Sequence, residues 1–297
     1  MTNQLPYTTA SAFNTALKAR LAAAAETSMH GINELRRQFA YDRLLIRIFA
    51  TDPDQWILKG AGGLLARRPE GARHSKDIDM YYRGEISVAL DELRNLAADD
   101  TVGDFFTFDI ERLPDRRGSD WAGLRVISYL GDLEFQLFSI DHVIDSNMTQ
   151  EPETVAALRP VPIDGLPTAD YRVYPLVDHV ADKHAAMIDT YHGGAASTRY
   201  RDLVDLALIA TTYPLAAADL RAALHSEYAH RGLDVPATVD LPDSSWEAGY
   251  AKVAATVPHL APPTATEALE IVRALLEPLF GDERNTGHWD PNRRCWS

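Results

Sequence analysis

Residues 56–82 read WILKGAGGLLARRPEGARHSKDIDMYY. Hydrophobic periodicity and glycine content divide this stretch into an apolar strand at 56–58, a glycine-rich turn at 59–63, a short helix at 64–68, a loop, and an alternating strand at 77–82. Side chains two positions apart on a strand point to the same face, so Asp77 and Asp79 present their carboxylates side by side. The stretch predicts a strand–turn–helix–strand unit with two acidic groups on one face.

This unit has the chemistry of a nucleotide-binding site. A glycine-rich turn lets the backbone approach a phosphate, and the N-terminus of the next helix offers free N–H groups and a positive dipole. Two carboxylates together with triphosphate oxygens suit Mg²⁺. Such ions activate an attacking hydroxyl and neutralise a leaving pyrophosphate. The alternative interpretation is that Asp77 and Asp79 form a solvated strand end without a ligand.

Two other phosphate-binding motifs do not fit the sequence. The glycines at 60–63 are not followed by Lys-Ser or Lys-Thr, which excludes a P-loop. The glycine spacing is wrong for a Rossmann fingerprint. In addition, the turn signal Gly131-Asp132 predicts a hairpin between strands at 124–130 and 133–140, which is not a βαβ repeat.

The rest of the chain predicts two domains. Segments with helical spacing or composition lie at 10–50, 86–98, 176–192, 198–212, 216–231, 244–257 and 264–279. Residues 105–113 read as a further strand, whereas 151–175 is rich in proline and turn residues, as in a linker or an edge excursion. The C-terminal GHWDPNRRCWS shows no clear periodicity. We expect an α+β domain with a mixed sheet at 1–170 and a helical C-terminal domain at 171–297.

Composition excludes several classes of protein. The 297 residues contain 29 Lys and Arg against 43 Asp and Glu, a net charge of −14, which argues against non-specific coating of nucleic acid but not against a local basic groove. The hydrophobic fraction of 46% is too high for a disordered chain. No apolar run approaches the roughly 20 residues of a membrane span, and the N-terminus does not read as a secretory signal. With Cys295 as the single cysteine, a cytoplasmic location is expected.

The motif order resembles the polymerase-β-type nucleotidyltransferase superfamily, in which a glycine-rich turn is followed by Asp-x-Asp. It is more closely similar to the AbiEii/AbiGii toxin family, including the MenT-type toxins, through LKG at 58–60 and RHSKDIDM at 73–80. A second block, ADKHAA at 181–186 followed by RYRDLVDL at 199–206, matches the family's Lys-x-x-Ala and Arg-x-[Lys/Arg/His]-Asp-x-x-Asp-Leu. The turn departs from the family pattern, because Ala61 stands where the family has glycine and no Ser or Thr follows.

The resemblance implies roles for particular residues. Asp77 and Asp79 are expected to hold Mg²⁺, with Glu134 as the expected third metal carboxylate. The nucleotide-binding residues are expected to be Lys59, Gly60, Gly62, Ser75, Lys76 and Lys183. Asp205 is expected to position Lys183 or the acceptor, so that both domains contribute to a central cleft. Two alternatives stay open at this point: Lys183 and Asp205 form an inter-helix salt bridge, and Glu134 is a solvent-facing strand residue.

The resemblance also implies a function. The expected activity is transfer of NMP from an NTP, CTP first, to an RNA acceptor such as the 3′ end of tRNA, which blocks translation and is opposed by a cognate antitoxin protein. The basic residues near the site are expected to contact RNA phosphates: Arg67, Arg68, Arg73, Lys76, Arg199 and Arg201. Alternatives are transfer to a protein or small molecule, a non-catalytic interaction module, and metal-dependent RNA cleavage.

Overall fold

The computed structural model describes residues 5–68, 71–114, 121–143, 147–191, 195–257, 261–281 and 286–297. Contacts within the chain divide it into two compact units. Unit 1 comprises Met1–Ser146 and Pro152–Val173, and unit 2 comprises Asn147–Glu151 and Tyr174–Ser297. The chain therefore enters unit 2 for a short segment, returns to unit 1, and then completes unit 2.

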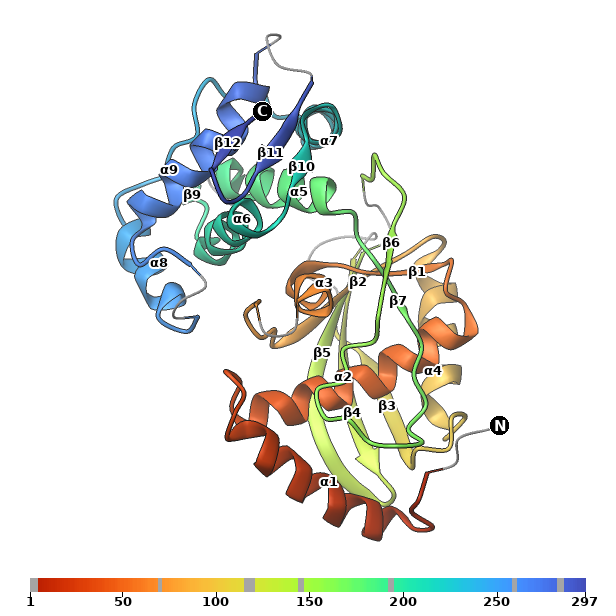
Figure 1. Ribbon diagram of the computed structural model, residues 1–297. Coiled ribbons are helices and arrows are strands. Elements are labelled where there is room, and N and C mark those ends of the chain that lie inside the picture. Colours follow the sequence, from red (N-terminus) through yellow and green to blue (C-terminus); the bar gives the residue numbers. More distant parts are fainter. Residues whose placement is uncertain are drawn as a thin grey trace. The chain divides into compact units, whose positions relative to one another are not determined.

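Unit 1 is built from helices and a mixed sheet (Figure 1). Its elements are α1 (Ala10–Ala25), α2 (Ile32–Thr51), β1 (Trp56–Leu58), α3 (Gly60–Arg67), β2 (Asp77–Tyr82), α4 (Ile86–Ala98), β3 (Phe106–Arg112), β4 (Trp121–Leu130), β5 (Leu133–Val143), β6 (Glu153–Val155) and β7 (Tyr171–Val173). The predicted strand at 77–82 and the predicted helix at 86–98 are confirmed. The predicted linker at 151–175 contains two short strands that join the sheet.

The sheet of unit 1 has, within the described residues, seven strands in the order β3-β4-β5-β2-β1-β7-β6. The neighbours β2 and β5 are parallel, as are β1 and β7, and the other neighbours are antiparallel. The β4–β5 hairpin confirms the predicted turn at Gly131-Asp132, where Gly131 has a φ of +57°. The parallel β2–β5 pair, whose strands are connected through α4, β3 and β4, sets the register on which the site depends.

One face of this sheet is the core of unit 1. Helix α2 packs on β5 and β7, α4 packs on β3, and the two helices contact each other, so both cover the same face (Figure 1). Phe39 of α2 packs against Phe106 and Phe135 of the sheet. The strands alternate between buried and partly exposed residues, as β2 does along its length. The opposite face, which carries Asp77 and Asp79, is only partly covered, and we call it the open face.

A buried ion network ties α2 to the sheet. Arg47 donates from Nη2 to Asp104 Oδ1 at 2.7 Å and to the Phe106 carbonyl at 2.6 Å, next to the start of β3. Arg43 donates to Asp42, and Tyr171 of β7 also donates to Asp42. These side chains are almost fully buried. Buried charges are tolerated only when they are paired and hydrogen-bonded, so the network fixes α2 against both β3 and β7.

Unit 2 is mainly helical, as predicted. Its elements are α5 (Leu176–Ile188), β8 (Thr190–Tyr191), β9 (Ala195–Ala196), α6 (Tyr200–Thr212), β10 (Leu215–Ala216), α7 (Ala217–Arg231), α8 (Trp246–Ala254), α9 (Ala265–Leu276), the 3₁₀ helix η2 (Glu277–Leu279), β11 (His288–Asp290) and β12 (Cys295–Trp296). The C-terminal residues form a hairpin that pairs with β10, and the sequence did not predict it. Trp289 anchors this hairpin by donating from Nε1 to the Ala210 carbonyl at 2.6 Å.

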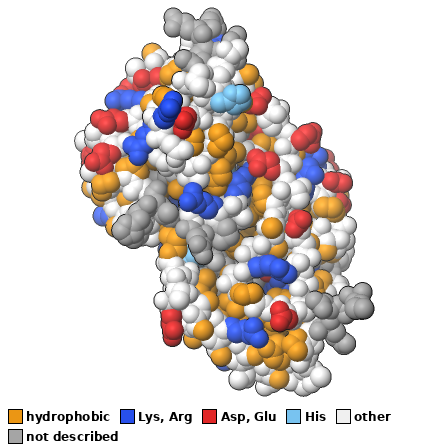
Figure 2. All heavy atoms as spheres, in the orientation of Figure 1, with side chains coloured by type: hydrophobic (Ala, Val, Ile, Leu, Met, Phe, Trp, Pro, Cys, Tyr) orange, Lys and Arg blue, Asp and Glu red, His pale blue; other side chains and the backbone are white. Residues whose placement is uncertain are grey.

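None of the helices in the described part of the chain combines the length and the apolar character that crossing a bilayer requires. Acidic and basic side chains are interspersed on the face that Figure 2 shows.

Candidate active site

The β2 aspartates lie on the open face beside a third aspartate. In the parallel β2–β5 pair, Asp77 is in register with Ser139 and Asp79 is in register with Asp141. Residues in register on adjacent strands share a face and lie about 5 Å apart. Asp77, Asp79 and Asp141 therefore form a row of acidic side chains on two central strands. Asp141 was not predicted as a site residue, because it follows the predicted end of its strand by one residue.

The structure places Glu134 away from Asp77 and Asp79. It lies at the hairpin end of β5, where it is exposed and pairs with Tyr129 of β4. Ser139, five residues further along β5, is the residue at the level of Asp77. At about 3.3 Å per residue, Glu134 is roughly 17 Å along the strand from that level. The alternative interpretation of Glu134 as a solvent-facing strand residue agrees with this position.

The glycine turn is in direct contact with Asp79. The Lys59 N–H donates to the Asp79 carbonyl at 2.8 Å, and Gly60 has a φ of +58°. A Cβ atom on Gly60 would lie 1.7 Å from Asp79 Oδ2, so only glycine fits at this position. Helix α3 begins at Gly60 rather than at the predicted residue 64, because the glycines at 62 and 63 continue the helix. The free N–H groups of its first turn therefore lie beside the carboxylates.

Ser75 connects the loop before β2 to the first aspartate. Its hydroxyl donates to Asp77 Oδ1 at 2.7 Å, and the residue is 3% exposed. This contact holds the Asp77 carboxylate in one orientation and occupies the hydroxyl that was expected to bind a phosphate. Lys76, the next residue, is exposed. The structure thus shows Ser75 as a residue that orients Asp77, and phosphate binding by Ser75 stays a prediction.

Helix α2 fixes this loop through His74. Arg37 lies 3.1 Å from His74 Nε2, and Gln38 lies 3.5 Å from Nδ1. Because a guanidinium only donates, Nε2 accepts this hydrogen bond and carries no proton, so the ring is neutral. Burial, reinforced by the positive charge of Arg37, lowers the pKa of His74 to about 3. Tyr41 stacks on the same ring.

Tyr41 adds a second contact to the loop. Its hydroxyl donates to the Ser75 carbonyl at 3.5 Å. Burial raises the pKa of Tyr41 far above its usual value of 10, so the hydroxyl stays protonated and can donate. Arg37, Gln38 and Tyr41 were not identified from the sequence, where they read only as polar positions on a helix. The signal that would find them is their place on the face of α2 next to the loop, which requires the fold.

The donor set fits a divalent ion that arrives with a nucleotide. In the described ranges, no group of three or more His, Cys, Asp or Glu side chains is already close enough together to hold a metal by itself. Mg²⁺ commonly takes only one or two carboxylates and completes its coordination with phosphate oxygens and water. Asp77 and Asp79, next to a helix N-terminus that attracts phosphate, provide such a half-site.

The second motif forms a buried ion cluster inside unit 2. Lys183 of α5 donates from Nζ to Asp202 Oδ1 at 2.9 Å and to Asp205 Oδ2 at 2.7 Å, both on α6. Arg199 also donates to Asp202, at 3.3 Å. Lys183 is 5% exposed and Asp205 is fully buried. The inter-helix salt bridge, which the sequence left open as an alternative, is therefore present, and nucleotide binding by Lys183 stays a prediction.

From the sequence, His184 and His192 are interpreted as structural, because they do not form a His-x₃-His ligand set. His184 Nδ1 contacts the Tyr228 hydroxyl at 2.7 Å, and burial lowers its pKa to about 4, in agreement with a structural role. His192 lies outside the described residues. Arg67 is paired with Glu153 of β6 at 2.9 Å and is nearly buried, so it is poorly placed to contact RNA. Arg68, Lys76 and Arg201 are exposed.

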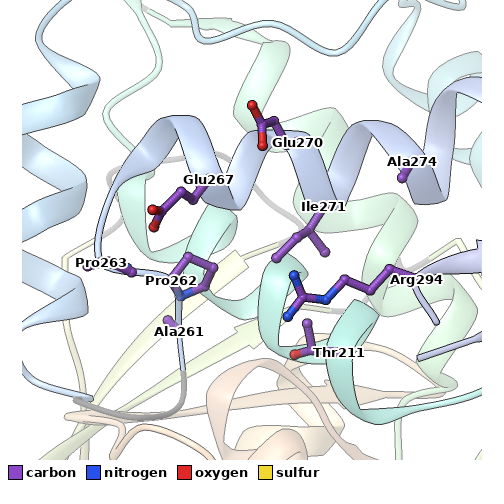
Figure 3. A pocket seen from close by; sticks show the side chains of 9 residues that line it. All are labelled: Thr211, Ala261, Pro262, Pro263, Glu267, Glu270, Ile271, Ala274 and Arg294. Carbon is purple, nitrogen blue, oxygen red and sulfur yellow. The ribbon is translucent and has the colours of Figure 1, made fainter. Parts of the chain in front are cut away.

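Unit 2 also has a pocket of about 720 Å³ away from its ion cluster (Figure 3). It is lined by Thr211, Ala261, Pro262, Pro263, Glu267, Glu270, Ile271, Ala274 and Arg294. Figure 3 shows the Arg294 guanidinium directed toward Thr211 and Ile271. None of the predicted site residues lines this pocket, and the chemistry of the sequence motifs does not extend to it.

The comparisons with known proteins agree with the motifs. The family model described as nucleotidyl transferase AbiEii toxin, type IV TA system, matches residues 43–276. Among solved structures, the chain is similar to MenT4, a nucleotidyltransferase toxin from Mycobacterium tuberculosis H37Rv. That match has a TM-score of 0.55 and 20% identity, and covers 90% of this chain and 99% of that one.

A second solved structure, from H. pylori, is described provisionally as a nucleotidyltransferase. It matches with a TM-score of 0.48 and 17% identity over 82% of this chain and 95% of that one. No curated protein sequence matches significantly. The likeness to MenT4 shows that the fold is shared, and the family match covers most of the chain.

Proposed function

Because this chain belongs to the family of AbiEii nucleotidyltransferase toxins of type IV toxin–antitoxin systems, we propose that it transfers a nucleoside monophosphate from an Mg²⁺-bound NTP to the 3′ end of an RNA, with tRNA as the acceptor. The family implies an NTP substrate and a cognate antitoxin. Modification of the tRNA 3′ end would block translation, which accounts for toxicity. The observation that supports this most is the row of aspartates beside the Gly60 turn.

Each part of this site has a distinct chemical task. Asp77 and Asp79 would hold the divalent ion, and the first-turn N–H groups of α3 together with Lys59 would bind the triphosphate. The ion, when bound, supplies positive charge that polarises the phosphoryl group and offsets charge on the leaving pyrophosphate. Ser75 keeps Asp77 oriented, and α2 keeps Ser75 in place. Catalysis of this kind is mainly positioning and electrostatic stabilisation.

Lys183 and Asp205 are proposed to support the same activity from unit 2. Their motif is part of the family resemblance, and an ammonium can bind a triphosphate as a point charge. In the structure the ammonium is shared by two aspartates. A role in nucleotide binding therefore requires that a phosphate replaces or adds to these contacts, which is a testable difference from a purely structural salt bridge.

The test is incubation with total tRNA, Mg²⁺ and each of four α-labelled NTPs. Label is expected in tRNA with one nucleotide, with CTP tested first. Asp79→Asn should abolish labelling, whereas Asp109→Asn, an exposed aspartate on the same face but on β3, should retain it. Label that migrates with protein would replace tRNA by a protein acceptor, and shortened RNA would indicate cleavage. No label with any nucleotide would contradict the transferase proposal.

A further inference from the structure

The open face of the unit 1 sheet continues from the aspartates across β5 and β4. We propose that the single-stranded 3′ end of the acceptor RNA binds along this part of the open face, with Arg125 contacting a phosphate. This inference rests on the proposed function and extends it, because it names the acceptor surface.

The direction of the reaction places the acceptor on the β5 side of β2. The glycine turn and the N-terminus of α3 follow β1, which pairs with one edge of β2, and β5 pairs with the other edge. A triphosphate held by the turn therefore has its leaving pyrophosphate on the β1 side. Phosphoryl transfer places the attacking and leaving oxygens roughly in line. The attacking hydroxyl must then approach from β5 and β4.

The register defines which side chains line that approach. Asp77 is in register with Ser139, and Ser139 is in register with Arg125 of β4. Arg125 is thus two strand spacings, about 10 Å, from Asp77 across the sheet. Two residues along from this line, Leu137 of β5 is opposite Ile127 of β4. These side chains share the face of the aspartates, because residues in register point to the same side.

The chemistry of this surface suits a single strand of nucleic acid. The Arg125 side chain is 49% exposed, and its partner at 3.7 Å is Glu111, whose side chain is 68% exposed. An exposed pair of this kind is weak, so the guanidinium can turn to a phosphate. Leu137 is 45% exposed and Ile127 is half-buried beside it. A cation next to an apolar platform is the combination that binds backbone and bases of a single strand.

Acidic side chains on β3 limit the part of the open face to which RNA can bind. Asp109 and Glu111 lie on β3 and are exposed on the same face, one strand beyond β4. Carboxylates repel phosphate, so an RNA strand would not spread onto β3. A protein with a net charge of −14 also repels RNA elsewhere, which makes a single local cation more important for binding.

The experiment measures binding of a fluorescent single-stranded RNA with a free 3′ hydroxyl by anisotropy, over a range of salt concentrations. Arg125→Ala is expected to weaken RNA binding at least fivefold and to reduce the salt slope by about 1. Leu137→Ser should weaken it severalfold without changing the slope. Glu111→Gln should tighten binding, since it removes the competing carboxylate. The control is Arg94→Ala on α4, whose side chain is 47% exposed but lies on the covered side.

Nucleotide binding, measured separately with a fluorescent NTP, should be the same in all these variants. Unchanged RNA affinity in Arg125→Ala and Leu137→Ser would overturn the acceptor surface while leaving labelling of tRNA by the unmodified protein intact. Loss of NTP binding in the same variants would overturn it too. If the unmodified protein labels only protein, the proposed RNA acceptor itself is wrong, which is a different result from failure of the surface.

Discussion

At the scale of single residues, Gly60 has little conformational freedom. Gly60→Ala places a methyl group on the Asp79 carboxylate and forces a left-handed backbone on a residue with a Cβ. We expect a stability loss of about 1–3 kcal/mol from the backbone strain and an activity loss of about 100-fold from displacement of Asp79. Labelling assays and thermal unfolding measure the two effects.

Gly31→Ala is the control for that substitution, because nothing lies within 4 Å of the added Cβ and the backbone is unstrained there. Its transferase activity should match that of the unmodified protein. An active Gly60→Ala protein would mean that Asp79 can move without loss of function.

The lowered pKa of His74 predicts how the free energy of unfolding depends on pH. Its pKa is about 3 in the folded protein, below its usual value near 6.5. Between these values the unfolded chain binds more protons, so the free energy of unfolding must fall as the pH decreases from 6.5 toward 3. The slope from this one group is at most about 1.4 kcal/mol per pH unit.

His74→Gln keeps a hydrogen-bonding side chain but does not titrate, so it should flatten this dependence in urea unfolding between pH 4 and 7. An unaltered slope in His74→Gln would contradict the neutral, buried state assigned to His74.

At the scale of elements, α2 both supports the sheet and aligns the loop before Asp77. Arg47→Ala leaves Asp104 buried without its main partner. We expect the free energy of unfolding of unit 1 to fall by about 3–5 kcal/mol, as for other broken buried pairs. Arg94→Ala, an exposed arginine on α4, should cost less than about 1 kcal/mol. Denaturant unfolding distinguishes the two, and equal losses would show that the network contributes little.

Features that depend on local sequence patterns were predicted correctly, whereas features that depend on long-range pairing or on very short elements were not. Asp77 and Asp79 were placed on one face because strand alternation is a local property. Asp141 was missed, and Glu134 was chosen in its place, because the register of a parallel pair depends on the chain between the strands. Strands β6, β7 and the C-terminal hairpin were missed for a similar reason: each has two or three residues, too few for a visible period. The predicted beginning of α3 was wrong because the run Gly-Ala-Gly-Gly at 60–63 is typical of a turn.

At the scale of the whole molecule, the ion cluster of unit 2 separates two interpretations. Asp205→Ala leaves the Lys183 ammonium buried with one fewer partner. If the cluster is structural, unit 2 should lose about 3–5 kcal/mol of stability. If Lys183 binds nucleotide, Lys183→Met should raise the KM for NTP well beyond what its stability loss explains. Calorimetry measures the stability of these variants, and initial-rate kinetics measures their KM for NTP. If neither the stability nor the KM changes, both interpretations are wrong.

The chain path between the units has a further consequence. Residues 147–151 belong to unit 2, where Asp178 accepts hydrogen bonds from the Thr149 and Gln150 N–H groups and from the Thr149 hydroxyl. A recombination event that joined the first 170 residues of one relative to the remainder of another would pair Asp178 with a foreign segment. Evolution can therefore exchange the two halves of such a gene only with difficulty, and the halves should be inherited together as one module.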